Sequence, residues 1–278
     1  MTTTIRPTGP LQQGADGAAS RTYDVCVNSR RVGTITVATD AAFGPAMGVI
    51  SGLRIDGPDQ GRGRGTVAAL AAEEVLRGWG CTQVRVAVPA GAVAALRMAD
   101  ALGYTERSRN MVKRLPAEPP ALPASVTARP MTEAEFTVWH HDEQENYARS
   151  WIARGIPADQ ARAKAEAEHR ALLPHGLATS GVRLEVLVSG DAVVGHVWVA
   201  RKELETGPAA YVYDVAVAEE HRGRGHGRAL MLLAERAALA DGMSTLALHV
   251  FTDNTPAVRL YQSLGYEPTE YNRAKALL

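Results

Sequence analysis

Two short glycine-rich segments carry the clearest chemical signal in the sequence. They run Gln60-Gly61-Arg62-Gly63-Arg64-Gly65 and Arg222-Gly223-Arg224-Gly225-His226-Gly227, each between an apolar run typical of a strand and a run typical of a helix. The first backbone amides of a helix have no partner inside the helix, and the helix dipole adds partial positive charge there. Glycine lets the backbone approach an oxyanion closely, so each segment predicts a binding loop for a pyrophosphate, although a tight turn without a ligand remains the simpler alternative.

The two loops belong to a repeat that covers most of the chain. A single offset, the one that brings Gln60 onto Arg222, superimposes them. The same offset brings Val32-Gly33 onto Val194-Gly195 and Gly103-Tyr104 onto Gly265-Tyr266 without a gap. Self-similarity at one fixed offset indicates a duplicated unit. The length of 278 residues also favours two domains, because single cores stop growing at roughly 250–300 residues.

A proline-rich segment separates the two copies. Residues 116–123 contain four prolines, which cannot continue a helix or a central strand. We therefore predict an N-terminal domain over 21–115, a linker over 116–124 and a C-terminal domain over 125–278. Residues 1–20 have no apolar core of the kind a signal peptide needs, so we expect a flexible leader there.

Composition excludes several classes of protein. The chain is 46% hydrophobic and 22% charged, which argues against a disordered or collagen-like chain. Lys+Arg and Asp+Glu number 30 each, so the basic excess typical of nucleic-acid or acidic-membrane binding is missing. No apolar run approaches the roughly 18–20 residues that span a bilayer. The two cysteines, Cys26 and Cys81, are too few for a disulfide framework, so we expect a cytoplasmic protein.

Hydrophobic periodicity divides the second copy into elements. Thr132 and Glu135 have the spacing of a capping box and predict the start of a helix. Residues 189–191 have the composition of a hairpin turn. The predicted order is a strand at 126–129, helical sequence to about 173 with a break at 155–157, strands at 183–188, 192–200 and 210–218, a helix at 228–240, a strand at 246–251, a helix at 255–264 and a tail strand.

With these elements in place, the chain resembles the GCN5-related N-acetyltransferase (GNAT) superfamily. The resemblance is carried by Val215-Ala216-Val217, by Arg222-x-x-Gly225-x-Gly227, and by Asn254-x-x-Ala257-x-x-Leu260-Tyr261-x-x-x-Gly265-Tyr266. It covers about residues 125–275 well and about 22–115 more weakly, and the tandem arrangement is similar to that of mycothiol synthase-like proteins. It implies an α/β (α+β mixed sheet) fold with two tandem domains. Each would have a central, mostly antiparallel sheet, with splayed fourth and fifth strands, flanked by helices.

The resemblance implies an acetyl-CoA-dependent N-acyltransferase site in the second copy. Tyr261 would stand near the sulfur and protonate the departing thiolate, and Asn254 would contact the pantetheine arm. The acceptor would be a small-molecule or terminal amine, and the co-substrate would be acetyl-CoA or another acyl-CoA, with no metal. Further cofactor-binding residues would be Val215, Ala216, Val217, Arg222, Gly223, Arg224, Gly225, His226, Gly227 and Arg228.

Two residues are candidates for the general base. His249 lies on the strand before Asn254, and its reference pKa suits the deprotonation of an ammonium near neutral pH. An ordinary polar strand residue is the alternative interpretation of His249. Asp214 is the second candidate, although strand alternation predicts that it faces opposite to Tyr213 and Val215.

The acceptor side of the site is predicted less sharply. Glu145, Tyr147 and Tyr213 are candidate substrate-binding residues, the first two in the helical region that forms the acceptor wall in this family. A solvated helix face explains Glu143 and Glu145 equally well, and Tyr147 also suits simple packing. His140-His141-Asp142 does not indicate a metal site, because adjacent histidines on a helix point in different directions.

The first copy lacks the residues that would do the chemistry. The offset between the copies places Ala99 at Tyr261, Ala92 at Asn254 and Ala87 at His249. We therefore expect a non-catalytic N-terminal domain that either still holds CoA or serves as a packing partner that completes the C-terminal copy, with a loop kept only as a turn as the alternative. Its cofactor-binding residues would be Leu53, Ile55, Gly61, Arg62, Gly63, Arg64, Gly65 and Thr66.

Two alternatives of other classes stay open at this point. The protein is either the enzyme described above, an acyl-CoA-binding sensor without turnover, or a scaffold whose paired domains bind another protein. Nucleic acid and membranes are not expected partners. Loss of turnover in Tyr261→Phe would separate the enzyme from the sensor, and a thermal shift with acetyl-CoA would exclude the scaffold.

Overall fold

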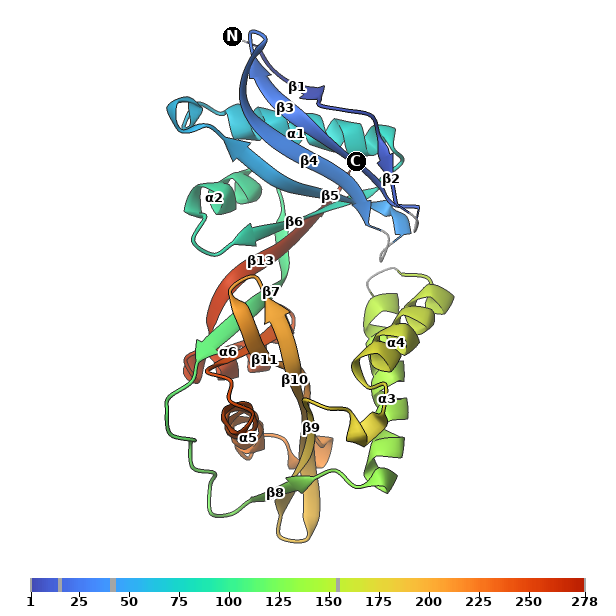
Figure 1. Ribbon diagram of the computed structural model, residues 1–278, viewed down its shortest axis with the longest axis vertical. Helices are drawn as coiled ribbons and strands as arrows, with labels where there is room; N and C mark the ends of the chain where they lie inside the picture. The colour runs from blue at the N-terminus through green and yellow to red at the C-terminus, as the bar shows by residue number, and fades with distance from the viewer. Residues whose placement is uncertain (1, 15–16, 41–43, 154–155, 278) are drawn as a thin grey trace. The chain divides into compact units, whose positions relative to one another are not determined.

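The structure is a computed structural model that describes residues 2–14, 17–40, 44–153 and 156–277. The chain divides into two compact units: unit 1 is Met1–Arg109 with Glu270–Leu278, and unit 2 is Asn110–Thr269. Each unit is a mixed sheet with helices packed on it, which confirms the predicted fold class (Figure 1). Among the described helices, none is long and apolar enough to cross a membrane.

Unit 2 contains the sheet order β7-β12-β11-β10-β9-β8. Neighbouring strands from β8 to β11 are antiparallel, and β11 and β12 are parallel. The first strands and helices lie close to the predicted positions, and η3 (Gly176–Ala178) is a short 3-10 turn before β9. The bounds are β8 Thr127–Pro130, α3 Glu133–Ile152, α4 Ala158–Leu172, β9 Val182–Ser189, β10 Ala192–Leu204, β11 Gly207–Val217, α5 His226–Ala240, β12 Thr245–Phe251 and α6 Thr255–Ser263.

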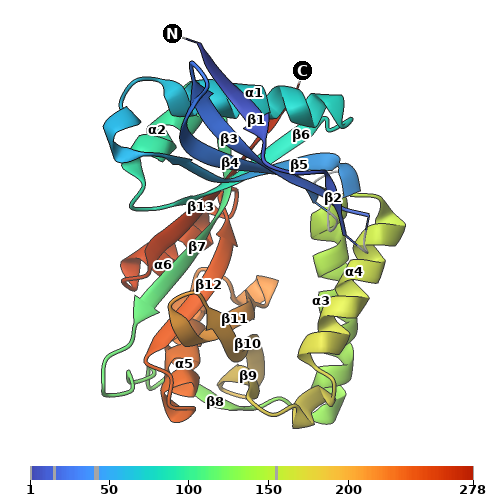
Figure 2. The same cartoon turned by 45° about the horizontal axis from the view of Figure 1, so that its top comes forward.

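Helices cover both faces of this sheet (Figure 1 and Figure 2). Side chains alternate along β10, so Val197 and Val199 pack in the cluster that holds Leu230 of α5. Trp198, which lies between them, packs on the other face with Trp139 of α3. The two apolar faces explain why α5 and α6 lie on one side of the sheet and α3 and α4 on the other.

Local signals set the starts of the helices. Thr132 and Glu135 form the predicted capping box of α3: the Thr132 backbone amide donates to Glu135 at 2.8 Å, and the Thr132 hydroxyl accepts from the Glu135 amide at 3.3 Å. Helix α5 begins after Gly225, which offers no side-chain acceptor. The first amides of α5 therefore point into a loop without a side-chain cap.

The parallel pair β11 and β12 separates partway along its length. Backbone pairing runs from Ala210↔Leu246 to Val212↔Leu248, while β11 continues to Val217 and β12 to Phe251. This is the splayed strand pair that the family resemblance implies. The edge of β11 that faces β12 is consequently available after residue 212 to line a cleft, while the other edge of β11 still pairs with β10.

Unit 1 repeats the same plan in a shorter chain segment. Strands β3 to β5 are antiparallel and β5 and β6 are parallel. The pairs Gly48↔Val84 and Ile50↔Val86 reproduce the β11–β12 register at the offset found in the sequence. The bounds are β1 Thr3–Pro7, β2 Gln12–Gln13, β3 Ala19–Val27, β4 Arg30–Asp40, β5 Gly44–Ile55, α1 Arg64–Gly78, β6 Gln83–Pro89 and α2 Val93–Ala101.

The first residues of the chain differ from the expected leader. Strand β1 pairs antiparallel with β3 from Thr3↔Val27 to Pro7↔Tyr23, and β2 pairs with β3 through Gln12↔Ser20. The open edge of β3 supplies unpaired backbone groups, so even a segment without an apolar core gains hydrogen bonds by adding to it.

The last strands of the two copies, β7 (Thr105–Arg114) and β13 (Glu267–Ala276), are exchanged. In unit 1, β13 pairs with β6 from Glu270↔Pro89 to Ala276↔Gln83, and the Leu277 amide donates to the Thr82 carbonyl at 2.8 Å. In unit 2, β7 lies beside β12, and the Leu115 amide donates to the Ser244 carbonyl at 2.9 Å. Unit 1 therefore contains most of the final strand of the second copy, and unit 2 contains the second half of the final strand of the first copy, in contrast to the boundary expected near residue 115.

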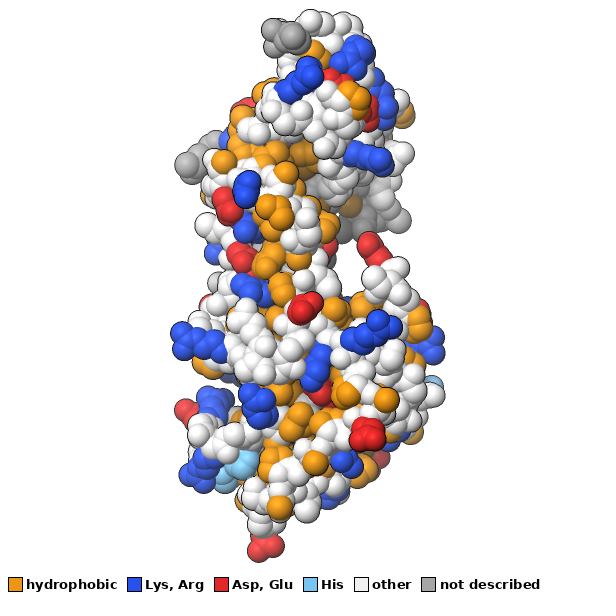
Figure 3. Space-filling view, turned by 90° about the vertical axis from the view of Figure 1, so that its left-hand side faces the viewer, with side chains coloured by type: hydrophobic (Ala, Val, Ile, Leu, Met, Phe, Trp, Pro, Cys, Tyr) orange, Lys and Arg blue, Asp and Glu red, His pale blue; other side chains and the backbone are white. Residues whose placement is uncertain are grey.

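The charged side chains agree with the zero net charge of the chain. On the face that Figure 3 shows, acidic and basic side chains are interspersed with apolar ones. Such a surface does not concentrate charge of one sign for a polyanionic partner on that face.

Candidate functional site

A groove lies beside the glycine-rich loop of unit 2. Gly223 and Gly225 have φ of 76° and 84°, a left-handed conformation that favours glycine. The loop follows η4 (Glu219–His221), and the Arg222 Nε donates to the Val217 carbonyl at 3.2 Å. The groove has a volume of about 530 Å³, and the residues that line it are Val215, Ala216, Val217, His221, Arg222, Gly223, Gly225, His226, Gly227, Asn254, Pro256, Ala257, Leu260 and Tyr261.

The groove suits the diphosphate of a CoA molecule. At Gly227 a Cβ atom would lie 3.3 Å from Leu260 Cδ2 and 3.9 Å from Val217 Cγ2, so only glycine keeps this wall free of a side chain. The start of α5 presents uncapped amides and the positive end of the helix dipole. Arg228 is turned towards α6, where it donates to the Ser263 hydroxyl at 2.6 Å. Arg222 and Arg224 are exposed beside the loop.

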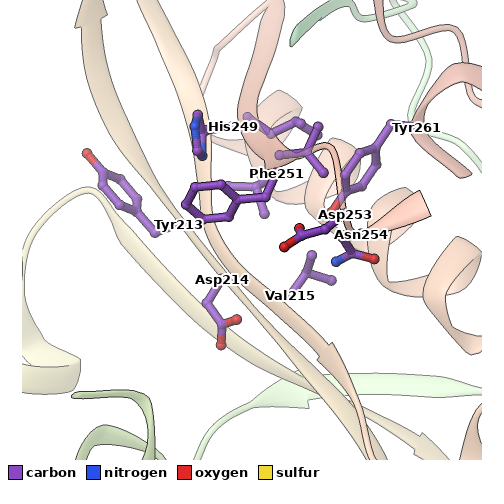
Figure 4. Close-up of a pocket in the computed structure, with 11 residues that line it drawn as sticks. Tyr213, Asp214, Val215, His249, Phe251, Asp253, Asn254 and Tyr261 are labelled. Carbon is purple, nitrogen blue, oxygen red and sulfur yellow. The ribbon is translucent and has the colours of Figure 1, made fainter. Parts of the chain in front are cut away.

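A second cavity of about 350 Å³ opens where β11 and β12 separate (Figure 4). It shares Val215, Asn254 and Tyr261 with the groove, so these three residues stand where the two spaces meet. The residues that line it are Val212, Tyr213, Asp214, Val215, Leu248, His249, Val250, Phe251, Asp253, Asn254 and Tyr261.

Tyr261 is placed by α6 at this junction. Its side chain is buried, with 7% exposure, and its ring centroid lies 5.9 Å from that of Tyr266. Burial, followed by the charge of Asp214, raises the pKa of Tyr261 to about 12. The phenol therefore remains a hydrogen-bond donor across the neutral range.

Asn254 has a structural partner as well as a place in the site. Its Oδ1 accepts from the Ala257 amide at 3.2 Å and so caps the start of α6. The side chain also borders both spaces (Figure 4). The cap fixes the first turn of α6, and this turn positions Tyr261 two turns further along the helix.

The two candidate bases, His249 and Asp214, both line the second cavity. The His249 ring packs edge-on against Phe251, with 4.8 Å between centroids. Asp214 Oδ2 accepts from His196 Nε2 at 2.7 Å and from Trp139 Nε1 at 3.1 Å. Figure 4 shows the Asp214 carboxylate turned away from Tyr261.

The expected alternation along β11 is interrupted. Trp198 pairs with Asp214 and Val199 pairs with Val212, which leaves Tyr213 as a bulge between them. Tyr213, Asp214 and Val215 consequently all border the cavity. Alternation alone predicts that Asp214 faces away from the other two.

The three predicted acceptor residues do not lie together. Tyr213 borders the cavity and stacks on Trp198, with 4.9 Å between ring centroids. Tyr147 packs edge-on against Trp151 and His169 instead, at 5.8 and 6.2 Å. Glu145 is 44% exposed, lies 3.8 Å from Arg162, and lines neither space.

Glu143 falls in the helical region of the expected acceptor wall, and the sequence left it open between that role and a solvated helix face. It is half-buried on α3, and burial, followed by the charge of Asp214, raises its pKa to about 8. The available signal was its position four residues after Trp139, which places both on one helix face. That signal has meaning only once Trp139 is known to reach Asp214.

The loop of unit 1 has the same backbone but a different charge pattern. Gly61 and Gly63 have φ of 69° and 74°, and α1 starts without a side-chain cap after η2 (Gly57–Asp59). The Arg64 side chain is 7% exposed and pairs with Asp59, which also accepts from Arg30 at 2.9 and 3.0 Å. The charge of Arg64 is therefore neutralised within the protein.

The other residues expected to bind CoA in unit 1 lie around its glycine-rich loop. Leu53, Ile55 and Met98 pack around Gly65, while Arg62 is exposed and Thr66 half-buried. The positions equivalent to Tyr261, Asn254 and His249 carry neither a hydroxyl nor an amide side chain. They hold a buried Ala99, Ala92 at the start of α2 without a side-chain cap, and Ala87 of β6, which pairs with Asn272 of β13.

Comparisons with known proteins show the family to which the chain belongs. The model of the acetyltransferase (GNAT) family matches residues 5–104 and 135–266. The uncharacterized N-acetyltransferase YycN of Bacillus subtilis is 29% identical over 160 residues, which are 55% of this chain and 99% of that protein. The mycothiol acetyltransferase of Thermobispora bispora is 43% identical over 77 residues, 27% of this chain and 26% of that protein.

A solved structure shares the fold of the chain in its tandem form. The tandem GNAT protein from the clavulanic acid biosynthesis pathway has a TM-score of 0.52 and 20% identity, covering 96% of this chain and 85% of that one. The family match spans most of the chain in two separate segments. The chain therefore belongs to the GNAT acetyltransferase family, and it is an acyltransferase with two tandem copies of that family's fold.

Proposed function

We propose that the protein transfers an acetyl group from acetyl-CoA to a small-molecule or terminal amine, and that unit 2 carries out the reaction. The observation that supports this most directly is the position of Tyr261, where the groove at the glycine loop meets the cavity bordered by Asp214 and His249. A thioester held along the groove would reach the phenol at one end, and an amine in the cavity would reach it from the other.

Each step then has a residue suited to it. Backbone amides between Val215 and Val217 that point away from β10 hold the pantetheine arm and donate to the oxygen of the carbonyl under attack. The amine nitrogen forms a bond to the carbonyl carbon as the carbon–sulfur bond breaks, and Tyr261 gives its proton to the sulfur. A base on the cavity wall takes the proton that the nitrogen loses.

We propose that unit 1 is non-catalytic. Alanine occupies the positions equivalent to Tyr261, Asn254 and His249, and Asp59 neutralises Arg64 beside the loop. Its loop nevertheless keeps the glycine backbone and an uncapped helix start. Whether this loop also takes a CoA molecule is decided by the stoichiometry of binding to the full chain.

Two matched variants test the binding sites. Gly227→Val fills the groove of unit 2, and Gly65→Val makes the equivalent change in unit 1, where Met98 Sδ lies 3.5 Å from the added Cβ position. In calorimetric titration of the full chain with acetyl-CoA, Gly227→Val should abolish the site that supports turnover. A second site that is lost in Gly65→Val would assign CoA binding to unit 1, and a stoichiometry of one would exclude it.

Thiol release measures the reaction itself. The wild-type chain, given acetyl-CoA and a panel of primary amines, should release free CoA in proportion to the acetylated amine. Tight binding of acetyl-CoA without thiol release from any amine would favour the sensor function instead. The mycothiol acetyltransferase of Thermobispora bispora matches over only 26% of its length, so the panel of amines, and not this relative, identifies the acceptor.

A further inference from the structure

A half-buried lysine of β10 lies against two tyrosine rings of β11. The Nζ atom of Lys202 is 3.8 Å from the ring centroid of Tyr211 and 5.8 Å from that of Tyr213. The two rings are neighbours, with 4.8 Å between their centroids. A ring face attracts a cation through its quadrupole but does not neutralise the charge. The ammonium is therefore held in place on one side and keeps its full charge for another partner.

Tyr213 connects this lysine to the cavity in which the acceptor amine is expected. Its side chain lines that cavity, and Figure 4 shows its ring on the side away from Tyr261. Trp198 of β10 stacks on the same ring, with 4.9 Å between centroids. An acceptor with its amine near Tyr261 would consequently extend along the Tyr213 ring and bring its other end towards Lys202.

The charge of Lys202 is not compensated by any residue that the structure describes. No described carboxylate forms an ion pair with it, and Glu168 of α4, whose charge raises the pKa of Lys202, pairs with Lys164 at 2.5 Å. Burial raises the pKa of Tyr211 and of Tyr213, so neither phenol supplies a negative charge near neutral pH. Burial is also the larger influence on Lys202 and lowers its pKa, because the ammonium loses water there. A bound anion would replace that water.

Unit 1 shows how the chain compensates a charge at the same position. The offset between the copies places Asp40 at the position of Lys202. Asp40 is buried and pairs with Arg85 of β6, with 2.5 Å between Oδ2 and Nη2. The residue of unit 2 at the position of Arg85 is Ala247, which carries no charge. The ion pair of unit 1 is thus replaced in unit 2 by a single cation beside the cavity.

We propose that Lys202 binds an anionic group of the acceptor, and that the acceptor is an amine that carries a carboxylate. The carboxylate pairs with the ammonium of Lys202, and the carbon chain of the acceptor packs along Tyr213 and Trp198. The same ammonium repels an acceptor that ends in a second ammonium, so it disfavours diamines. This inference rests on the proposed function and deepens it by naming the substrate class.

Calorimetry tests the anion site without turnover. The full chain, saturated with CoA, is titrated with glycine, β-alanine, γ-aminobutyrate and ε-aminocaproate, and with the carboxamide of each. At least one of these acids should bind roughly 10–100-fold more tightly than its carboxamide, because a hydrogen bond between charged groups is lost in the amide. Equal binding of every pair, or no detectable binding of any acid, would overturn the inference. This comparison uses the wild type alone and does not depend on the folding of a variant.

Variants at one position separate charge from packing. Lys202→Met keeps a long side chain over Tyr211 and should remove the preference for the acid, whereas Lys202→Arg should retain it. Lys202→Glu should reverse the order and favour cadaverine, a diamine, over ε-aminocaproate. Arg201→Met is the matched control, because Arg201 is the adjacent residue of β10, is 58% exposed and pairs with Glu203. It removes the same charge and should leave the preference unchanged.

Thiol release tests the role of Lys202 in the reaction. Lys202→Met should lower kcat/KM for the preferred acid roughly 10–100-fold, mostly by raising KM, and leave kcat/KM for the carboxamide nearly unchanged. The ratio of variant to wild type cancels the intrinsic reactivity of each amine. An equal loss for acid and carboxamide would show that Lys202 serves packing alone and would overturn the inference.

The two possible failures are distinguishable. Absence of turnover with every amine contradicts the proposed function, whereas the calorimetric comparison by itself decides whether Lys202 binds a carboxylate. If the acids bind through Lys202 without being acetylated, the anion site stands and the sensor function replaces the enzyme. If amines are acetylated with no difference between acids and carboxamides, the proposed function stands and the carboxylate-bearing acceptor is excluded.

Discussion

Lys113 Nζ lies 2.6 Å from Glu235 Oε1, although 122 positions separate the two in the chain. The same contact recurs at the equivalent positions of the other unit, where Lys275 lies 2.8 Å from Glu73. Both glutamates are 1% exposed, and each lysine comes from the last strand of the other copy. The repeated ion pair therefore connects each exchanged strand to the helix core of the unit that it completes.

Lys113→Met should destabilise unit 2 strongly. It leaves the buried Glu235 charge without its cation, a loss that typically costs about 3–5 kcal/mol. Urea denaturation monitored by tryptophan fluorescence measures this loss in the free energy of unfolding, because all the tryptophans of unit 2 lie on α3 and β10. The double variant Lys113→Met with Glu235→Gln should recover part of the loss. A cost as small as that of the exposed pair Arg201–Glu203 would show that Glu235 is not held by Lys113.

Deletion of residues 270–278 should loosen unit 1 and leave unit 2 folded. The deletion removes the antiparallel partner of Gln83–Pro89, whose backbone groups then face solvent. Hydrogen exchange should show lost protection in β6 and retained protection in α5, which serves as the internal control. Equal protection of β6 in the truncated and full chains would contradict the strand exchange. A fragment of residues 1–115 lacks the same strand, so it is not a suitable test of CoA binding by unit 1.

The exchanged strands mark where prediction from sequence ends. The loop, the capping box and the helix boundaries follow from patterns within a few residues, and these agree with the structure at Thr132, Gly225 and Gly265. Strand exchange depends on which of two sheet edges, both far along the chain, the strand pairs with. The tail strand would show the same alternation of apolar and polar residues at either edge. Pairing of the tail with β6 was therefore beyond any local pattern.

The site shows the same division between local and distant information. Tyr261 and Asn254 could be selected because their spacing on one helix is local. Glu143 could not, because its significance depends on Asp214, which lies far along the chain and reaches α3 beside a bulge at Tyr213. Burial of the Glu143 carboxyl group is a tertiary property that the helical pattern of α3 does not encode.

Tyr261→Phe should reduce kcat roughly 10²-fold while the affinity for acetyl-CoA stays nearly unchanged. The substitution removes the phenol proton and keeps the buried ring that packs near Tyr266. Steady-state thiol release gives kcat, and calorimetry gives the affinity for acetyl-CoA. Tyr266→Phe is the matched control for loss of a buried hydroxyl, because Tyr266 donates to Glu235 and lines neither cavity. Full activity in Tyr261→Phe would remove this residue as the acid.

The stability of the chain should depend on pH through Glu143. Its folded pKa of about 8 lies above the reference value of 4.5, so the folded state binds the proton more tightly than the unfolded state. The contribution of that proton to stability is fully present below about pH 4.5 and is lost as the pH rises to about 8. Glu143→Gln removes the titration, so the variant should gain stability relative to the wild type across this window.

Thermal unfolding at several pH values measures that difference. The Tm of Glu143→Gln minus that of the wild type should increase from pH 5 to pH 8 and then level off, because the wild-type carboxyl is ionised in both states at higher pH. Asp214→Asn should reduce the same slope, since it removes the charge that adds to the burial of Glu143. Glu166→Gln should show no such trend, because Glu166 is exposed. A Tm difference that is constant from pH 5 to pH 9 would mean that Glu143 ionises normally and that its burial does not raise its pKa.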